Sequence, residues 1–342
     1  MAVPSAHEFH WQSLSRLASG RVYHSLCEVG GQMYMLGGCD AVGRPSPALE
    51  VYSPEGDRWM TLPQMPTPRA GAAVAVLGKQ ILVVGGVGED QSPLKVVEMF
   101  NTEEGKWRKR STLREALMGV SITVKVGGMG ADLLPRSILQ QYDLRKDVWA
   151  LLPPMPTARY DANTHLLANK LYVAGGRQCK RPVKAFEVFD AETRSWTTLP
   201  SMPCKRSYGG VLWDVNGRLC LLGGLRQGGH QSSKFTKNVN IFDTNQGTPK
   251  SCWLKSEETV AMKTKRADFA SAFLRGRMVV AGGLVEAFHP QKKKWERLSP
   301  MNSPRCSTSS IVIRDRLLVV GGVNQVPSSA HEILYVKEEE YL

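Results

Sequence analysis

Long apolar runs, a basic leader and paired cysteines are all missing from this 342-residue sequence. No stretch approaches the roughly 18 consecutive apolar residues of a membrane span, and the first residues, MAVPSAHEFHW, have no basic region before an apolar one. We therefore predict no transmembrane segment and no secretory leader, and we expect a cytoplasmic protein. The seven cysteines are scattered without a Cys-x-x-Cys pair, which fits reduced thiols and gives no zinc site.

Motifs for catalysis are equally scarce. The seven histidines include no His-x-His pair, and no Gly-x-Ser-x-Gly turn is present. No pair of carboxylates stands out from the acidic residues of ordinary turns. We expect no enzyme activity, no cofactor and no metal site, although ligands that are distant in sequence could still converge in the fold.

Negative charge is in deficit, because 31 acidic residues against 44 basic ones leave a formal net charge of +13. A field of this sign favours acidic proteins, polyanions or anionic membrane surfaces without choosing among them. Two basic runs, KWRKR at 106–110 and QKKKW at 291–295, resemble nucleic-acid patches, but each flanks a tryptophan on a predicted hairpin. Solvated turn charges explain these runs better, so we expect no nucleic-acid partner.

One repeated pattern dominates the chain. An apolar run ends in a glycine pair seven times, and the first five pairs are separated by 48, 42, 48 and 48 residues. An aromatic residue with a tryptophan seven positions later follows most pairs. A fixed period of this length indicates a repeat fold. Alternating apolar runs such as AAVAVLG and KVVEMF, separated by turn residues, predict short strands and no helix. The pairs are Gly37-Gly38, Gly85-Gly86, Gly127-Gly128, Gly175-Gly176, Gly223-Gly224, Gly282-Gly283 and Gly321-Gly322.

The repeated units predict an all-β, seven-bladed β-propeller with four-stranded antiparallel blades. One small sheet cannot bury both of its faces, and radial stacking of copies covers them and protects their edges. The sequence resembles the kelch-repeat family over essentially its whole length: a strand closed by a glycine pair, then an aromatic residue, then tryptophan, then MPTPR or a variant. The stretches LGKQILVVGGVG, SPLKVVEMFN, CKRSYGGV and KRADF narrow the resemblance to the kelch domain-containing protein 8 group.

The ring is predicted to be closed by the N-terminal strand at residues 9–14, because the last unit lacks its tryptophan strand and FHWQSL supplies one. Blades three and six are predicted to be shortened. About six residues are missing between Trp107 and Gly127, and about nine between Gly282 and Phe288, relative to the other copies. The single kelch domain, residues 1–342, is expected to contain repeats at about 21–62, 69–111, 114–152, 159–199, 206–256, 266–298 and 305–336.

The segment VVGGVGED at residues 83–90 permits a different interpretation, because a glycine-rich turn after a strand can bind phosphate. A nucleotide site of this type also needs a helix after the glycines and an acidic residue at a strand end about 20 positions later. The chain instead turns into another strand, and six sister copies do much the same. We interpret the glycine pairs as structural turn residues that tolerate positive φ.

One face of the predicted propeller should be basic, because the links between blades and the loops after the glycine pairs emerge on the same side. A repeat arginine stands in six links, and blade three has Arg114-Glu115 instead. At this position of kelch-like blades an arginine commonly bonds neighbouring backbone or acidic groups, so a structural role remains an alternative. The basic residues after the glycine pairs are not repeated, which favours partner recognition. The predicted partner-binding residues are Arg177, Lys180, Arg181, Arg226, Tyr23, Tyr160, Tyr208, Arg21, Arg69, Arg159, Arg206, Arg266 and Arg305.

The first functional hypothesis is a non-catalytic module that recognises an acidic or polar peptide or protein partner on this face, as the kelch resemblance implies. A substrate receptor of a ubiquitin ligase and a cytoskeletal or cell-division scaffold remain alternatives. A pulldown that recovers cullin-adaptor subunits or filament proteins would separate these hypotheses. The sequence leaves the oligomeric state open.

Overall fold

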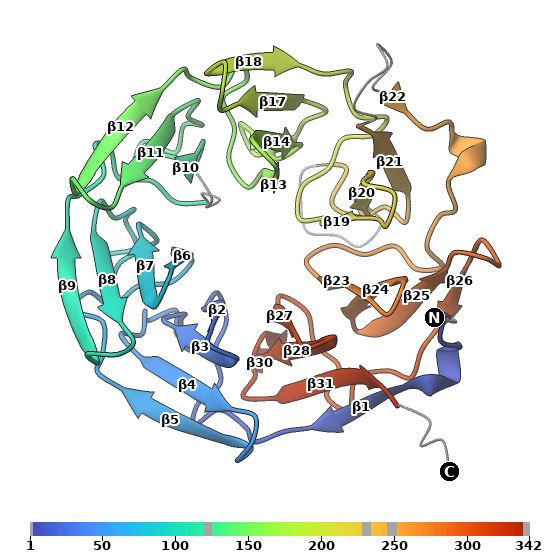
Figure 1. Ribbon diagram of the computed structural model, residues 1–342, viewed down its shortest axis with the longest axis horizontal. Coiled ribbons are helices and arrows are strands. Elements are labelled where there is room, and N and C mark those ends of the chain that lie inside the picture. The colour runs from blue at the N-terminus through green and yellow to red at the C-terminus, as the bar shows by residue number, and fades with distance from the viewer. Residues whose placement is uncertain (1–2, 120–124, 228–233, 245–251, 338–342) are drawn as a thin grey trace. The chain divides into compact units, whose positions relative to one another are not determined.

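The protein is all-β and consists of antiparallel sheets (Figure 1). The helical elements of the described residues are short 3-10 turns such as Ala6–Glu8 and Ser256–Glu258. The sheets group into two compact units, Arg21–Ser207 and the combination of Met1–Gly20 with Tyr208–Leu342. The computed structural model describes residues 3–119, 125–227, 234–244 and 252–337.

The unit Arg21–Ser207 contains the first four repeats. Within each of its sheets the strands lie in the order in which they follow one another along the chain. A two-stranded hairpin, β15 (Arg177–Gln178) and β16 (Arg181–Pro182), interrupts the fourth repeat. The sheets are β2 (Ser25–Val29), β3 (Gln32–Leu36), β4 (Leu49–Ser53) and β5 (Arg58–Leu62); β6 (Ala73–Leu77), β7 (Gln80–Val84), β8 (Val97–Asn101) and β9 (Lys106–Arg110); β10 (Lys125–Val126), β11 (Leu139–Asp143) and β12 (Val148–Leu152); and β13 (Asn163–Leu167), β14 (Lys170–Ala174), β17 (Phe186–Asp190) and β18 (Ser195–Thr198).

The other unit contains the last three repeats and the N-terminal strand. Strand β1 (Phe9–Ser13) pairs antiparallel with β31 (His331–Val336), with Trp11 opposite Leu334, and supplies the fourth strand of the last sheet. The remaining strands are β19 (Gly210–Trp213), β20 (Leu219–Leu222), β21 (Val239–Asp243) and β22 (Cys252–Trp253); β23 (Ala270–Leu274), β24 (Arg277–Gly282), β25 (Leu284–His289) and β26 (Lys294–Arg297); and β27 (Ser309–Ile313), β28 (Arg316–Val320) and the small pair β29 (Val323–Asn324) and β30 (Val326–Pro327).

The prediction of seven four-stranded blades is wrong, because the structure shows six. Within the described residues the third repeat forms only a three-stranded sheet, in which the two-residue strand β10 pairs with β11 and β11 with β12. The physical reason is the short span between Trp107 and Gly127, which leaves less chain for a first hairpin than the other repeats have. Residues 120–124, which belong to the segment predicted to be incomplete, lie outside the described residues.

The sixth repeat, also predicted to be shortened, keeps four strands. Compared with the other repeats, it has a shorter connection between its second and third strands, β24 and β25. Gly282 at the end of β24 pairs directly with Leu284 at the start of β25, and Gly283 turns the chain between them with a φ of 67°. Glycine adopts this left-handed conformation at little steric cost. The deletion therefore removes a loop and preserves the sheet.

The core lies between successive sheets of each unit, where inward-facing apolar residues alternate along the strands. Leu36 of the first repeat belongs to one buried cluster with Ile81 and Val83 of the second. In the other unit, Val279 of the sixth repeat shares a cluster with Leu317 of the seventh. Neighbouring sheets thus bury surfaces that no single sheet could cover alone.

Five of the signature tryptophans connect their sheet to the preceding repeat of the same unit. The rings of Phe100 and Trp107 lie 5.1 Å apart, and the Trp107 indole N–H donates to the carbonyl oxygen of Pro63 at 2.7 Å. A buried indole is most stable when its N–H has such a partner. Equivalent hydrogen bonds run from an indole N–H to a backbone carbonyl oxygen in four other pairs: Trp11 with Ser299, Trp149 with Ser111, Trp196 with Pro153 and Trp295 with Val260.

Candidate partner-binding site

The repeat arginines, which the sequence analysis assigned to a basic face, are buried. Arg69, four residues before β6, is fully buried, and its Nη2 lies 2.5 Å from Oε2 of Glu98 in β8, which is also fully buried. Its Nη1 donates to the carbonyl oxygens of Gly85 and Val96, both at 3.0 Å. The equivalent ion pairs are Arg21–Glu50, Arg159–Glu187, Arg266–Glu286 and Arg305–Glu332.

Burial governs the ionisation of these arginines. Desolvation lowers the pKa of Arg159 to about 10, and the carboxylate of Glu187 opposes this shift. Desolvation also lowers the pKa of Arg69, opposed by Glu98. Arginine is effectively always protonated in proteins, so each of these buried cations depends on its glutamate for compensation. We conclude that these arginines stabilise their own repeats and are not available to a partner.

The third repeat has lost both members of the pair. Leu117 occupies the position of the repeat arginine and Gln140 that of the glutamate, and both are fully buried. Arg114-Glu115, interpreted from the sequence as the replacement for the arginine, lies just before this position. Glu115 instead pairs with Arg136 at 2.6 Å. The third repeat therefore lacks both charges of the buried ion pair.

The fifth repeat retains the arginine but not the glutamate. Arg206 is fully buried, and Asn240 of β21 stands where the other repeats have a carboxylate. The Nη2 of Arg206 donates to Sγ of Cys204 at 3.1 Å. Arg206 therefore also belongs to the interior, and none of the six repeat arginines contributes to an exposed basic surface.

The hairpin β15–β16 holds two of the predicted basic residues that are exposed, Lys180 and Arg181. Its backbone is anchored by Tyr160, which is buried and whose hydroxyl accepts a hydrogen bond from the N–H of Lys180 at 3.2 Å. The guanidinium of Arg177 lies over the Tyr160 ring, 5.8 Å from its centroid, and donates to the carbonyl oxygen of Lys180 at 3.0 Å. Tyr160 is therefore a supporting residue of the hairpin and not a contact residue.

Residues 177–184, which we call the basic hairpin, have the sequence RQCKRPVK and contain no acidic residue. Lys180, Arg181 and Lys184 are exposed, and Arg177 is half-buried. Cys179 and Lys180, at the tip, adopt left-handed backbone with φ of 47° and 64°. Four cations within eight residues create a local positive field on a turn whose backbone is fixed by hydrogen bonds.

The predicted site residues are divided between the two units. Arg177, Lys180, Arg181 and Tyr160 form one site, whereas Tyr208 and Arg226 belong to the other unit. Arg226 is exposed there and Tyr208 is half-buried, with its carbonyl oxygen accepting from the N–H of Asp268 at 2.8 Å.

The residue two positions after the repeat arginine adopts a left-handed backbone, which was not predicted from the sequence. This position links successive repeats, because the N–H of Gly71 donates to the carbonyl oxygen of Tyr23 at 2.8 Å. Tyr23 itself is 59% exposed. The available signal was the choice of glycine in two repeats and of short polar residues in three others, all of which tolerate positive φ better than most residues. The residues are Tyr23, Gly71, Gly119, Asp161, Tyr208, Asp268 and Ser307.

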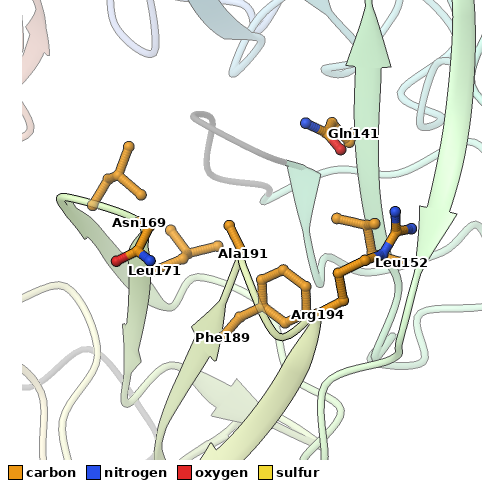
Figure 2. Close-up of a pocket in the computed structure, with 8 residues that line it drawn as sticks. Gln141, Leu152, Asn169, Leu171, Phe189, Ala191 and Arg194 are labelled. Carbon is orange, nitrogen blue, oxygen red and sulfur yellow. The ribbon is translucent and has the colours of Figure 1, made fainter.

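Figure 2 shows an apolar cavity of about 80 Å³ between the third and fourth repeats. Gln141 and Leu152 line one side, and Leu171, Phe189 and Ala191 line the other. This volume is well below the roughly 300 Å³ of the smallest common ligand pockets. Among the described residues, no three His, Cys, Asp or Glu side chains converge as metal ligands, and no helix is long and apolar enough to cross a membrane.

Several known proteins are similar to this chain. Kelch domain-containing protein 8B of Rattus norvegicus is 42% identical over 175 residues, which is 47% of this chain and 48% of the relative. The protein of the same name from Homo sapiens is 41% identical over 175 residues, which is 47% of this chain and 48% of the relative. The chain thus spans about half the length of these relatives, and they confirm the resemblance to the kelch domain-containing protein 8 group.

More distant relatives extend the similarity over more of the chain. Kelch-like protein 40 of Xenopus tropicalis is 25% identical over 223 residues, 60% of this chain and 34% of the relative. A solved structure described as "Structure of YjhT" has a TM-score of 0.60 and 15% identity, and the match covers 94% of this chain and 96% of the other. At this identity the likeness shows the fold alone.

Two family models match the repeats directly. The Kelch motif matches residues 20–66 and 68–114, and the KLHDC2/KLHL20/DRC7 Kelch-repeats domain matches residues 117–322. The second match alone covers more than half of the chain, and the two together include all seven glycine pairs. The chain therefore belongs to the kelch-repeat family.

Proposed function

We propose that this chain is a non-catalytic protein-interaction module that binds an acidic segment of a protein partner through the basic hairpin. The observation that supports this proposal is the concentration of Arg177, Lys180, Arg181 and Lys184 on one turn without any acidic neighbour in sequence. Membership of a family of interaction modules supports the general function. We further propose that it acts in the cytoplasm, because its seven cysteines form no disulfide.

The basic hairpin is suited to this task because it is already ordered. Tyr160 holds the guanidinium of Arg177 and the backbone of Lys180. Binding would therefore order side chains on a turn whose backbone is already fixed, and less conformational entropy would be lost. Guanidinium groups such as that of Arg181 can form two parallel hydrogen bonds to one carboxylate. The net charge of +13 would also accelerate the encounter with an acidic partner.

Zero-length carbodiimide cross-linking tests the proposal, because this reagent joins a lysine amine only to a carboxylate in direct contact. The full chain is incubated with a cell extract, cross-linked, and analysed by peptide mass spectrometry. We expect cross-links from Lys180 and Lys184 to Asp or Glu residues of one or a few partner proteins. Lys106 and Lys109 in β9 of the same unit are exposed and serve as internal controls.

The control lysines also define the contradicting result. If partner carboxylates attach equally to Lys106 and Lys109, the contact is non-specific attraction to a basic protein. If they attach only there, the binding surface lies on β9 and the basic hairpin has been assigned wrongly. Cross-links from Lys180 that disappear at 0.5 M salt while the protein stays folded agree with an electrostatic contact.

A further inference from the structure

A turn in the third repeat exposes two large apolar side chains. Residues 130–135, GADLLP, which we call the leucine turn, lie in the connection between β10 and β11. Leu133 is 57% exposed and Leu134 is 53% exposed. The first and second repeats have the corresponding turn at residues 40–45 and 88–93, each beginning two positions after the glycine pair and ending in proline.

The three turns share one backbone conformation, so they can be compared position by position. In each turn the fourth residue has a left-handed φ and donates its N–H to the carbonyl oxygen of the first residue, at 3.0 or 3.1 Å. This fourth residue is Gly43 in the first repeat, Gln91 in the second and Leu133 in the third, with φ of 80°, 61° and 63°. A left-handed φ is easy for glycine and rare for a large side chain.

Leu133 gains nothing structural in exchange for this conformation. The side chain of Gln91, at the same position, donates to the carbonyl oxygen of Gly43 at 3.2 Å and so ties its turn to the preceding one. A leucine side chain has no donor for such a bond, and more than half of Leu133 is exposed to solvent. Large side chains held in a left-handed conformation are concentrated at active sites and ligand-binding sites. The leucine turn is therefore a candidate contact surface.

The leucine turn lies beside the basic hairpin, in the same unit. The N–H of Gly128, two residues before the leucine turn, donates to the carbonyl oxygen of Arg159 at 3.1 Å. The N–H of Arg177, the first residue of the basic hairpin, donates to the carbonyl oxygen of Tyr160 at 2.8 Å. Neighbouring residues of one link thus hold both segments. The bases of the two segments lie within roughly 15 Å of each other, given the usual Cα spacings along a chain and across a hydrogen-bonded pair.

We propose that the leucine turn and the basic hairpin together bind one extended segment of a protein partner, in which a large apolar side chain lies about four residues from a group of acidic residues. This inference rests on the proposed function and adds an apolar contact to it. The partner's apolar side chain would cover Leu133 and Leu134 and remove their surface from water. Its carboxylates would contact the basic hairpin. An extended segment advances about 3.3 Å per residue, so four or five residues reach from one site to the other.

The charges near the leucine turn favour this occupant. The carboxylate oxygens of Asp132 and Glu115 lie 2.9 Å and 2.6 Å from Nη2 of Arg136, so these acidic residues are paired within the third repeat. The basic hairpin contains four cations and no acidic residue. A segment that covers the leucines is therefore attracted when its carboxylates lie on the side of the hairpin. The net charge of +13 opposes association with a second copy of this chain.

Selection of random 12-residue peptides displayed on phage, with the full native chain as the target, tests this inference. We expect enrichment of acidic residues together with leucine, phenylalanine or tryptophan at a fixed separation of about three to five positions. The variant L133Q with L134S copies Gln91-Ser92 of the second repeat, a sequence that the same turn already accommodates. Selection on this variant should enrich the acidic residues without the apolar one.

Fluorescence anisotropy of one selected peptide then measures the affinities. Binding should be about tenfold weaker for L133Q with L134S, because the apolar surface that the peptide covers is lost. The matched control is V148Q with L151Q. It removes two apolar side chains of similar exposure, 47% and 46%, from β12 of the same repeat, and it should bind like the native chain.

Failure of this inference is distinguishable from failure of the proposed function. Enrichment of acidic residues alone overturns the inference and leaves the proposed function intact, whereas enrichment of peptides without acidic residues, or of none at all, contradicts both. Native affinity of L133Q with L134S, or an equal loss in V148Q with L151Q, also overturns the inference. So does a native chain that sediments as a dimer and becomes monomeric in L133Q with L134S, because the leucine turn would then contact a second copy.

Discussion

Replacement of Glu98 by glutamine should destabilise the protein strongly, because it removes a buried charge and leaves the partner charge in place. Arg69 and Glu98 are both fully buried, and Nη2 of Arg69 lies 2.5 Å from Oε2 of Glu98. The other carboxylate oxygen accepts a hydrogen bond from the Thr67 hydroxyl at 2.8 Å. Removal of one member of a buried ion pair costs about 3–5 kcal/mol of unfolding free energy.

The third repeat suggests a compensating change. There Leu117 and Gln140 occupy the two positions, so the double variant R69L with E98Q copies an arrangement that this fold already contains. The double variant loses the donors to the carbonyl oxygens of Gly85 and Val96, and we expect a cost of about 1–3 kcal/mol. This cost is well below the sum of the single variants, because no uncompensated charge remains buried.

Urea unfolding followed by tryptophan fluorescence measures these free energies. The control is E103Q, because Glu103 pairs with Lys79 on the surface, where the side chains are 62% and 66% exposed. An exposed pair of this kind contributes less than about 1 kcal/mol. The reasoning is refuted if E98Q is as mild as E103Q, or if the double variant costs as much as the two single variants added together.

Three further predictions concern the N-terminal strand, the buried thiols and the third repeat. Deletion of residues 1–16 removes β1 and exposes an edge of β31, so light scattering should detect aggregation at a temperature where the full chain is monodisperse; an unchanged melting temperature and solubility would contradict this. Burial raises the pKa of Cys27 and Cys220 to about 12 from 9.0, so the folded state keeps protons that the unfolded state loses. The contribution of each thiol to the free energy of unfolding should be constant below about pH 9 and should fall between pH 9 and 12 by up to about 1.4 kcal/mol per pH unit, as urea unfolding can measure. The double variant C27A with C220A should show a shallower slope, because burial also shifts the pKa of Cys39, Tyr52 and Arg159, which titrate in the same alkaline range. An equal slope in both proteins would refute the assignment. Amide hydrogen exchange should be fastest among the sheets in β10–β12, whose described part has three strands, and uniform protection across all sheets would contradict the prediction.

The strands could be predicted because the same sequence pattern recurs in successive repeats of the chain. The alternation in KVVEMF and the tryptophan at position 107 recur in other copies with the same spacing, so one ambiguous segment is interpreted from its neighbours. The third repeat was the exception. The short interval between Trp107 and Gly127 showed that this repeat lacks residues. It did not show whether the described residues would form three strands or four shorter ones, and they form three.

Side-chain direction could not be predicted in the same way. Strand order places the link that contains Arg69 at one end of a sheet, yet it does not say whether the guanidinium points outward or back toward Glu98. A signal was present, because glutamate stands two positions before the aromatic residue in LEVY, VEMF and FEVF. A repeated acidic residue within an apolar strand needs a buried cation. The anchor of the basic hairpin was harder to find, since Tyr160 lies 20 residues before Lys180.

The most direct test of the account is the affinity of a purified partner, identified by cross-linking, for the native chain and for the charge-reversal variant K180E with R181E. The account predicts binding at least tenfold weaker in this variant, with an unchanged melting temperature, because both side chains are exposed and neither belongs to the buried ion pairs. The matched reversal K106E with K109E should bind like the native chain. Equal affinity of K180E with R181E, or a loss confined to K106E with K109E, would contradict the assignment of the basic hairpin as the partner-binding site.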